Sequence, residues 1–225
     1  MNFDNKIIPN FCSDEELAFL DKFIVENTTA WNNYLNPNYQ KEGDAPVLNA
    51  VYYSFPYYHE IYKPVYDILE SKIRKHFGDL YIGEIHVFDS FDPYMIHTDI
   101  ESGILENPAW TFIIPLDNYD SHTIVFKEGS MQKDMDDYMA THDPYPESTI
   151  DEATYQKYFS HCSREYFKYL TIDEIFKWEK GALFAASRYR HHTSDNFIAN
   201  GLKGKRAQAC PGSPKTLIEI FLVIF

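Results

Sequence analysis

Two stretches in the N-terminal part of the chain repeat apolar residues with the period of an α-helix. The first follows Ser13 and Glu16, which are spaced as in a capping box at a helix start. The second runs from about Tyr58 to Phe77 and ends before Gly78, a residue typical of the position after a helix. Pro64 lies inside the second pattern, so it either kinks this helix or marks its true start.

Most of the remaining apolar residues form short runs rich in β-branched and aromatic side chains, which is the pattern of strands. Turn residues separate these runs, most clearly between Asp117 and Ser121. The polar segment 27–46 contains Asn, Pro and Gly and is predicted to be a loop. The predicted strands cover residues 47–55, 80–82, 85–88, 94–96, 110–116, 123–126, 181–186 and 216–225.

A long polar segment, about 128–180, interrupts the strand pattern. It contains too few apolar residues to build a core of its own, so we interpret it as an insertion between strands. Within it, 151–167 and 171–178 have the composition of helices. Long insertions of this kind often cover an active site.

Composition supports one mainly β domain with flanking helices. Aromatic residues make up 17% of the 225 residues, and such residues favour strands. A chain of this length is sufficient for a single large core. We therefore predict a single domain over 1–225, with 1–79 as helical support and 80–225 as a β core that carries the insertion.

The charge of the chain narrows the possible partners. Its formal net charge of −14 disfavours nucleic acid and acidic membrane surfaces, both of which attract cationic proteins. The first nine residues contain no apolar signal core. Cys12, Cys162 and Cys210 are far apart and odd in number, which argues against a disulfide framework and favours a cytoplasmic location.

One local motif carries candidate metal chemistry. His97 and Asp99 are separated by one residue, so in an extended chain both side chains point to the same side. An imidazole and a carboxylate, joined by a second imidazole, form a facial triad that leaves open positions on the metal. His191 and His192 are the candidates for this second imidazole.

At this point the chain resembles the iron(II)/2-oxoglutarate-dependent oxygenases, and most closely their prolyl-4-hydroxylase-like and phytanoyl-hydroxylase-like branch. That family has a His-x-Asp pair, a long gap and a distal histidine. The resemblance extends from about Leu80 to the C-terminus. It is carried by His97-Thr98-Asp99, the run Trp110 to Leu116, the run Gly181 to Phe184 and the run His192 to Phe197.

The resemblance implies a ligand set and a cosubstrate site. His97, Asp99 and His192 match the metal positions, with His192 preferred to His191 for its spacing to the residues that follow. The far carboxylate of 2-oxoglutarate is expected to pair with a basic residue after the distal histidine. The candidates, in order of preference, are Lys205, Lys215 and Arg206. Tyr94 is a further candidate to hydrogen-bond the cosubstrate, and 206–214 resembles an extra loop.

The resemblance also implies a fold and an activity. The fold expected is a double-stranded β-helix, or jelly roll, with the helices packed outside it. The activity expected is hydroxylation of a small, amino-acid-like molecule or a peptidyl residue, with Fe(II), 2-oxoglutarate and O2. Because the carboxylate of Asp99 is present, hydroxylation is favoured over halogenation.

Two other interpretations remain open from the sequence. The first is a cupin-like metalloprotein that does not use 2-oxoglutarate, and the second is a non-enzymatic β-sandwich with a coincidental motif. Several polar residues near the motifs are expected to have ordinary structural or surface roles, His122 as an exposed turn residue and Arg188 and Arg190 at the surface. The other histidines predicted to be structural are His59, His76, His86, His142 and His161.

Overall fold

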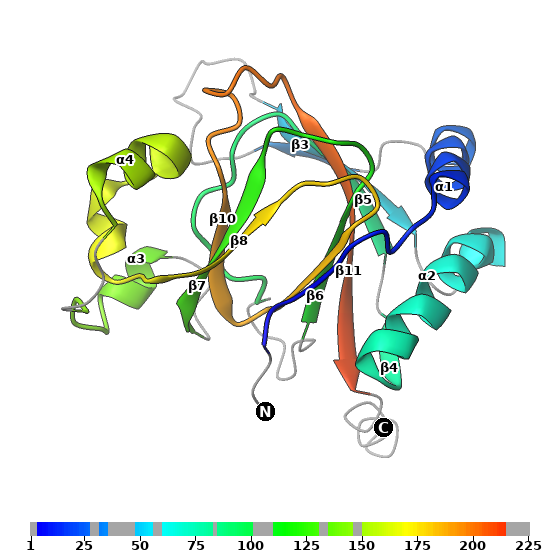
Figure 1. Ribbon diagram of the computed structural model, residues 1–225, viewed down its shortest axis with the longest axis horizontal. Coiled ribbons are helices and arrows are strands. Elements are labelled where there is room, and N and C mark those ends of the chain that lie inside the picture. The colour runs from blue at the N-terminus through cyan, green and yellow to red at the C-terminus, as the bar shows by residue number, and fades with distance from the viewer. Residues whose placement is uncertain are drawn as a thin grey trace.

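A large antiparallel sheet forms one side of the molecule (Figure 1). The computed structural model describes residues 4–27, 32–35, 48–55, 60–82, 85–100, 110–130, 135–145 and 150–214. The strands of this sheet follow the order β2, β3, β5, β11, β6, β9 and β1, and β4 also pairs with β11. Their bounds are β1 (Lys6–Ile8), β2 (Asn32–Leu35), β3 (Leu48–Phe55), β4 (Leu80–Ile82), β5 (Ile85–Ser90), β6 (Trp110–Pro115), β9 (Leu183–Ser187) and β11 (Lys205–Pro214).

A smaller antiparallel sheet faces the central part of the large one. Its strands are β10 (Arg190–Ser194), β7 (His122–Gly129) and β8 (Ile172–Lys177), in that order. The space between the sheets is filled by apolar residues from both, such as Val125 of β7 and Phe184 of β9. Residues 123–126 of β7 and all of β9 are buried, which accounts for the apolar run Ile124 to Phe126 and for the apolar residues of β9.

Two long helices cover the outer face of the large sheet, α1 (Asp14–Asn27) and α2 (Lys63–Phe77). The capping box predicted for α1 is confirmed, because the Glu16 amide donates to Ser13 Oγ and the Ser13 amide donates to the Glu16 carboxylate. Pro64 lies in the first turn of α2, after the short 3-10 helix η2 (Glu60–Tyr62), so it marks the start of the helix. Within the described ranges, no helix is long and apolar enough to cross a lipid bilayer.

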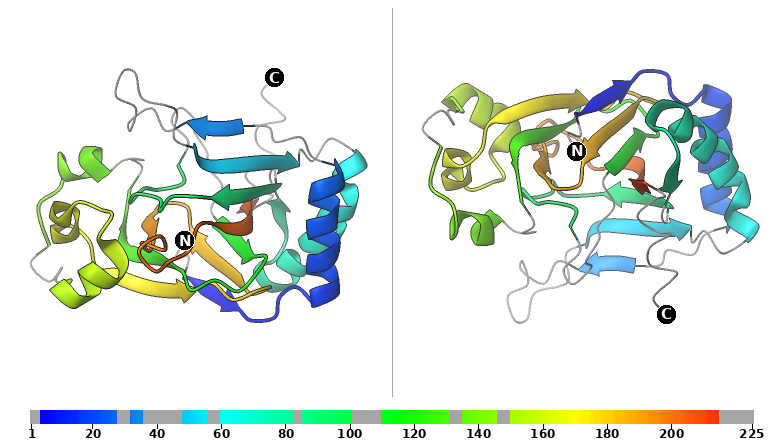
Figure 2. Two further views of the ribbon diagram at one scale, coloured as in Figure 1. Left: turned by 90° about the horizontal axis from the view of Figure 1, so that it is seen from above. Right: turned by 90° about the horizontal axis from the view of Figure 1, so that it is seen from below.

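Short helices between β7 and β8 cover the outer face of the small sheet. Outward-facing residues of β7, such as Phe126, pack against Phe159 and Phe167 of this segment. Both views of Figure 2 place these helices at the opposite end of the molecule from α1 and α2. Their bounds are α3 (Met135–Met139), α4 (Glu152–Thr154), the π-helix η3 (Tyr155–Phe159) and the 3-10 helix η4 (Arg164–Lys168).

Two predictions of secondary structure were wrong in ways that matter for the site. Residues 171–178 were expected to be helical but contain β8, whose backbone is hydrogen-bonded to β7. The segment 206–214 was expected to be a loop, yet it is part of β11, which pairs with β5 on one side and β6 on the other. In both cases pairing with distant strands overrides local sequence preference.

Smaller differences concern strand positions. The predicted loop 27–46 contains β2, which pairs with β3 at the edge of the sheet. Residues 94–96 are not a strand, and this part of the chain joins the small sheet only through an isolated bridge between His97 and His192. The short strands β1 and β10 were not predicted. The predicted strand 216–225 lies outside the described residues.

Candidate metal centre

The bridge between His97 and His192 joins two segments that are far apart in the sequence. Each residue's amide donates to the other's carbonyl, at 3.0 Å from His97 and 2.9 Å from His192. The centroids of the two imidazole rings are therefore only 4.4 Å apart. This backbone pairing fixes the separation of the two rings independently of any ligand.

Asp99 completes a group of three possible ligands. Its Oδ1 lies 3.7 Å from Nε2 of His97 and 3.5 Å from Nε2 of His192. The candidate ligand atoms of the three residues all lie within 4.8 Å of one another. The structure thus brings together the three residues that the sequence motif selected, although its sequence spacing alone did not specify this distance.

The protonation of both imidazoles suits metal binding. Nδ1 of His97 donates to the Met95 carbonyl at 2.7 Å, and Nδ1 of His192 donates to the Arg190 carbonyl at 3.0 Å. A carbonyl oxygen can only accept, so each Nδ1 carries the hydrogen. In the neutral ring Nε2 then has its lone pair available, and it is Nε2 that faces Asp99.

The orientation of Asp99 is fixed by two other residues. Thr111, on β6, donates its hydroxyl hydrogen to Oδ2 of Asp99, which leaves Oδ1 directed at the imidazoles. The Arg188 guanidinium donates to the backbone carbonyl of Asp99, and the Asp99 amide donates to the Arg188 carbonyl at 3.1 Å. Arg188 is buried, so its predicted surface role is wrong.

Electrostatics favour a charged carboxylate at the centre of the group. Burial acts to raise the pKa of Asp99, but the imidazoles of His192 and His97 and the Arg188 guanidinium outweigh it and hold that pKa well below its usual range. Burial acts to lower the pKa of His192, whereas the neighbouring Asp99 carboxylate raises it overall. The site therefore holds a negative charge that attracts a cation, whether a proton or a metal ion.

His191, the other candidate for the distal ligand, faces away from this group. It lies on the opposite side of β10, where its ring packs edge-on against Tyr138 of α3 with centroids 4.6 Å apart. Its two ring nitrogens have no hydrogen-bond partner among the described residues, and burial lowers the pKa of His191 to about 4. The sequence preference for His192 agrees with this placement, because adjacent residues of a strand face opposite sides.

Lys205, the first residue of β11, places its ammonium group between the two sheets. Its side chain is buried, and Nζ lies 3.8 Å from the centroid of the Trp178 ring and 4.8 Å from that of Phe197. Nζ also donates to Ser121 Oγ at 2.9 Å. Burial lowers the pKa of Lys205 to about 7, against an opposing influence from the Asp195 carboxylate.

The register of the small sheet relates Lys205 to the metal ligands. His192 is paired with Val125, and Ser194 with Thr123, so all four residues face the space between the sheets. The Trp178 ring, which contacts Lys205, donates its indole hydrogen to Thr123 at 2.8 Å. The ammonium group of Lys205 therefore lies on the same inner side as His192, further along β7.

The other predicted cosubstrate residues are placed differently. The side chains of Arg206 and Lys215 lie outside the described part of the structure. The ring of Tyr94 lies beside the imidazole of His97, with centroids 5.8 Å apart, and its amide donates to Ser194 Oγ at 2.9 Å. Arg190, which was predicted to lie at the surface and was not a cosubstrate candidate, is half-buried and bonds to Asp173 and to the Phe126 carbonyl, both at 3.1 Å.

Sequence reasoning missed a buried polar network beside Lys205. His122, predicted to be an exposed turn residue, donates from Nδ1 to the buried carboxylate of Asp195 at 2.9 Å. The other oxygen of Asp195 accepts from Ser121 at 2.6 Å. These contacts join positions more than seventy residues apart, so no local pattern in the sequence indicated them.

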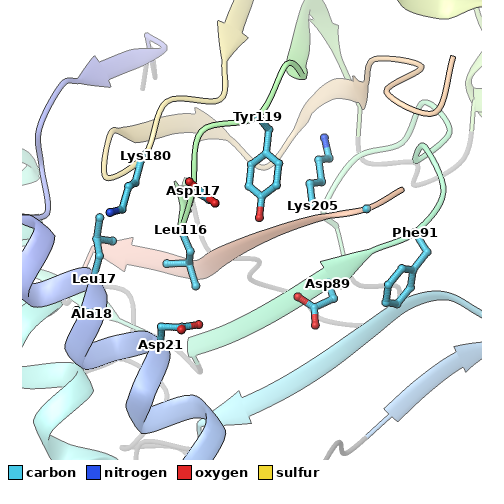
Figure 3. A pocket seen from close by; sticks show the side chains of 11 residues that line it. Leu17, Ala18, Asp21, Asp89, Phe91, Leu116, Asp117, Tyr119, Lys180 and Lys205 are labelled. Atoms are coloured by element: carbon cyan, nitrogen blue, oxygen red, sulfur yellow. The ribbon is translucent and has the colours of Figure 1, made fainter. Parts of the chain in front are cut away.

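A cavity of about 460 Å³ lies on the other side of the Lys205 backbone, between α1 and the segment that follows β6. None of the three candidate metal ligands lines it. Figure 3 shows the Lys205 nitrogen directed away from the Asp21 and Asp89 carboxylates of this cavity. The cavity is thus separate from the metal centre.

Comparison with known proteins gives likeness in structure only. No protein-family model matches the chain, and no curated protein matches it in sequence. Solved structures do match. One is the epimerase SnoN in complex with Fe3+, alpha ketoglutarate and nogalamycin RO, with a TM-score of 0.54, 13% identity and coverage of 93% of this chain and 78% of that one.

Two further structures have similar scores. A 2OG-Fe(II) oxygenase family oxidoreductase from Burkholderia pseudomallei has a TM-score of 0.52 at 9% identity, covering 93% of this chain and 84% of that one. The non-heme alpha ketoglutarate dependent carbocyclase SnoK from nogalamycin biosynthesis has a TM-score of 0.52 at 13% identity, covering 92% and 78%. The chain therefore shares its fold with 2OG-Fe(II) oxygenases, the superfamily that its sequence motifs resemble.

Proposed function

We propose that this protein is an Fe(II)- and 2-oxoglutarate-dependent oxygenase that hydroxylates a small, amino-acid-like molecule or a peptidyl residue. The observation that carries the proposal is the convergence of His97 Nε2, His192 Nε2 and Asp99 Oδ1, with both imidazole tautomers fixed by backbone carbonyls. Two imidazoles and one carboxylate form the donor set of non-haem Fe(II) oxygenases, and this set fits the residues present.

The arrangement of strands supports a double-stranded β-helix. In this proposal β5, β11, β6 and β9 form one wall, and the bridge at His97 with β10, β7 and β8 forms the other. The metal ligands then come from neighbouring parts of one wall, His97 and Asp99 after β5 and His192 within β10. Two backbone hydrogen bonds hold these parts together.

Lys205 is the residue best placed to hold the far carboxylate of 2-oxoglutarate. Of the described residues, no carboxylate is ion-paired directly with its ammonium group, which is buried against two aromatic rings and one hydroxyl. A buried cation without a direct counter-ion is costly unless a ligand supplies one. We therefore prefer Lys205 to Arg206 and Lys215 for this role. We also propose that Tyr94, whose ring lies beside His97, donates a hydrogen bond to the cosubstrate.

The chain's own residues prepare the reaction, and the bound groups supply its oxidising power. When Fe(II) and 2-oxoglutarate are bound, decarboxylation of 2-oxoglutarate to succinate and CO2 is coupled to insertion of one oxygen atom of O2 into a substrate C–H bond. His97, Asp99 and His192 would hold the metal and leave positions for the cosubstrate and O2. Thr111 and Arg188 keep Asp99 in place, and the apolar residues between the sheets exclude water.

Hydroxylation is the reaction that we propose among several that this fold supports. Two of the solved structures described above are an epimerase and a carbocyclase, so likeness of fold does not select the outcome. The cupin-like alternative makes no use of an anionic cosubstrate, and the buried ammonium of Lys205 favours the oxygenase over it.

The first experiment is an anaerobic titration of the metal-free protein with Fe(II) and then 2-oxoglutarate, followed by visible absorption. We expect a metal-to-ligand charge-transfer band in the native protein and its loss in His192→Ala. The matched control is His191→Leu, because His191 is buried, makes no hydrogen bond among the described residues and faces away from the group. A native protein without the band, or a band that survives in His192→Ala, would contradict the proposal.

A further inference from the structure

A chain of hydrogen bonds connects Lys205 to a buried carboxylate on another segment. Nζ of Lys205 donates to Ser121 Oγ at 2.9 Å, and Ser121 donates its own hydrogen to Asp195 Oδ1 at 2.6 Å. His122 donates from Nδ1 to the other oxygen of Asp195 at 2.9 Å. The side chains of Ser121 and Asp195 are inaccessible to solvent, and Lys205 is only 4% exposed.

The network contains one negative charge, on Asp195, and one positive charge, on Lys205, which do not form a direct ion pair. Burial acts to raise the pKa of Asp195, but hydrogen bonds from His122 and Ser121, together with the Lys205 charge, lower it overall, so the carboxylate is ionised. This charge in turn opposes the effect of burial on the pKa of Lys205. One hydroxyl group separates the two charges, so the ammonium keeps donor capacity that a direct ion pair would use.

We propose that Asp195 is a positioning residue that holds the Lys205 ammonium group, through Ser121, between the two sheets as a preformed receptor for the far carboxylate of the cosubstrate. This inference rests on the proposed function, because it concerns how the same site binds 2-oxoglutarate. Among the described residues, the Asp195 carboxylate bonds to Ser121 and His122 and not to a candidate metal ligand, and in this proposal it does not touch the cosubstrate. It acts through Ser121 and Lys205.

The geometry around Lys205 supports this role. The rings of Trp178 and Phe197 stabilise a cation through their π-electrons but accept no strong hydrogen bond. Among the described residues, Ser121 is the hydrogen-bond acceptor for Nζ. Its position is set by Asp195 and by the Trp178 amide, which donates to the Ser121 carbonyl at 2.9 Å. Without Asp195, the ammonium loses both the negative charge that raises the pKa of Lys205 and the group that orients its acceptor.

The test compares two keto acids on Asp195→Asn, a variant that keeps the size of the side chain and removes its charge. Binding is measured by calorimetry on protein loaded with Mn(II), using 2-oxoglutarate and 2-oxopentanoate. The second ligand has the same keto acid end and chain length and lacks the far carboxylate. We expect the Kd for 2-oxoglutarate to rise about tenfold at pH 7.5, as for a one-unit fall in the pKa of the receptor, and the Kd for 2-oxopentanoate to stay unchanged.

Two further variants keep the test decisive. Ser121→Ala interrupts the network while leaving the Asp195 charge and its contact with His122. This variant should also raise the Kd for 2-oxoglutarate and leave the Kd for 2-oxopentanoate unchanged. Asp120→Asn removes an exposed negative charge from the residue next to Ser121 and should change neither Kd. Thermal unfolding and Mn(II) affinity report whether each variant is folded with its metal site intact.

The outcomes separate this inference from the proposed function. Native Mn(II) protein that does not bind 2-oxoglutarate would overturn the proposed function itself. Native protein that binds it, with folded Asp195→Asn and Ser121→Ala binding both keto acids as the native protein does, would overturn only the role of Asp195. Equally weakened binding of both keto acids would also overturn this role. That result would indicate a purely structural effect, which does not depend on the far carboxylate.

Discussion

At the scale of single residues, the candidate site depends on polar contacts to those atoms of the candidate ligands that face away from the metal position. Each imidazole is fixed by one carbonyl, and Asp99 is fixed by the Thr111 hydroxyl on one oxygen. Such outer contacts commonly change metal affinity tenfold to a hundredfold when they are removed. They are therefore the places where conservative substitutions give informative results.

Thr111→Val should weaken metal binding without unfolding the protein. Valine has the shape of threonine but cannot donate to Asp99 Oδ2, so the carboxylate loses the contact that orients it. We expect the Kd for Fe(II) or Mn(II) to rise about tenfold or more, measured by anaerobic metal titration. Thr111→Ser keeps the hydroxyl and serves as the control. Equal affinities in the two variants would show that the contact does not orient the ligand.

The binding of 2-oxoglutarate should weaken as pH rises through the pKa of Lys205. Burial lowers that pKa to about 7 in the ligand-free protein, so the ammonium that attracts a carboxylate is lost above this pH. Asp195 opposes this effect, and His122 and His161 are the other titratable groups of the surrounding network. The measurement is the Kd from pH 6.5 to 9 on Mn(II) protein.

Lys205→Arg provides the control for this pH dependence, because a guanidinium stays charged over the whole range. We expect the slope of Kd with pH to disappear in this variant even if its affinity is lower. A slope that persists in Lys205→Arg would assign the titration to another group.

At the scale of elements, the accuracy of prediction follows the range of the interactions involved. Helix α1 was predictable because its capping box joins residues three positions apart. Strand β11 was not, since its sequence contains Pro211, Gly212 and Pro214 and it is extended because β5 and β6 flank it.

The residues of the candidate site also differ in how far they could be predicted, again according to the range of their contacts. The spacing of His97 and Asp99, and the residues after His192, were visible in the sequence as local motifs. Arg188 contacts Asp99 across 89 positions and Ser121 contacts Asp195 across 74, so only the folded chain reveals these partners.

Gly181 is required where the segment before β9 passes α1, and its replacement by alanine should destabilise the fold. Its φ of +71° disfavours other residues, and an added Cβ would lie 2.6 Å from the Cys12 carbonyl oxygen. The Cys12 amide donates to the Gly181 carbonyl at 2.9 Å, so the two segments cannot separate freely.

Gly201→Ala is the matched control, because Gly201 has a φ of +89° but nothing within 4 Å of its added Cβ. The control should lose about 1–2 kcal/mol of unfolding free energy from backbone strain alone. Gly181→Ala should lose about 1–3 kcal/mol more from the clash. Denaturant unfolding measures both, and equal losses would show that the segments shift apart at no cost.

At the scale of the whole molecule, three apolar clusters divide the stability between different layers. One lies between the helices α1 and α2 and the large sheet, one between the sheets, and one beneath the segment between β7 and β8. The last of these contains Phe159, which is fully buried against Phe126 and Phe167. This division predicts that the layers respond separately to local damage.

Phe159→Ala should loosen the segment between β7 and β8 more than the rest of the molecule. Removing this ring costs about 3–5 kcal/mol of packing in a buried site. We expect faster amide hydrogen exchange in residues 150–171, with the amides of α2 much less affected. Leu69→Ala, in the cluster under α2, should give the reverse pattern. Uniform acceleration in both variants would mean that the clusters unfold as one unit.

The central position of β11, together with its late place in the sequence, determines when the large sheet can close during synthesis. Without this strand, the large sheet consists of two separate parts, β2-β3-β5 and β6-β9-β1, each with an unpaired edge. Residues 97, 99 and 192 are synthesised before residue 205. The nascent chain therefore holds all three candidate metal ligands while these edges are still open. Closure of the sheet then depends on contacts distant in sequence, which form slowly and leave edges exposed to other chains. If the protein is the proposed oxygenase, metal capture before closure would compete with self-association through the open edges in the newly synthesised chain.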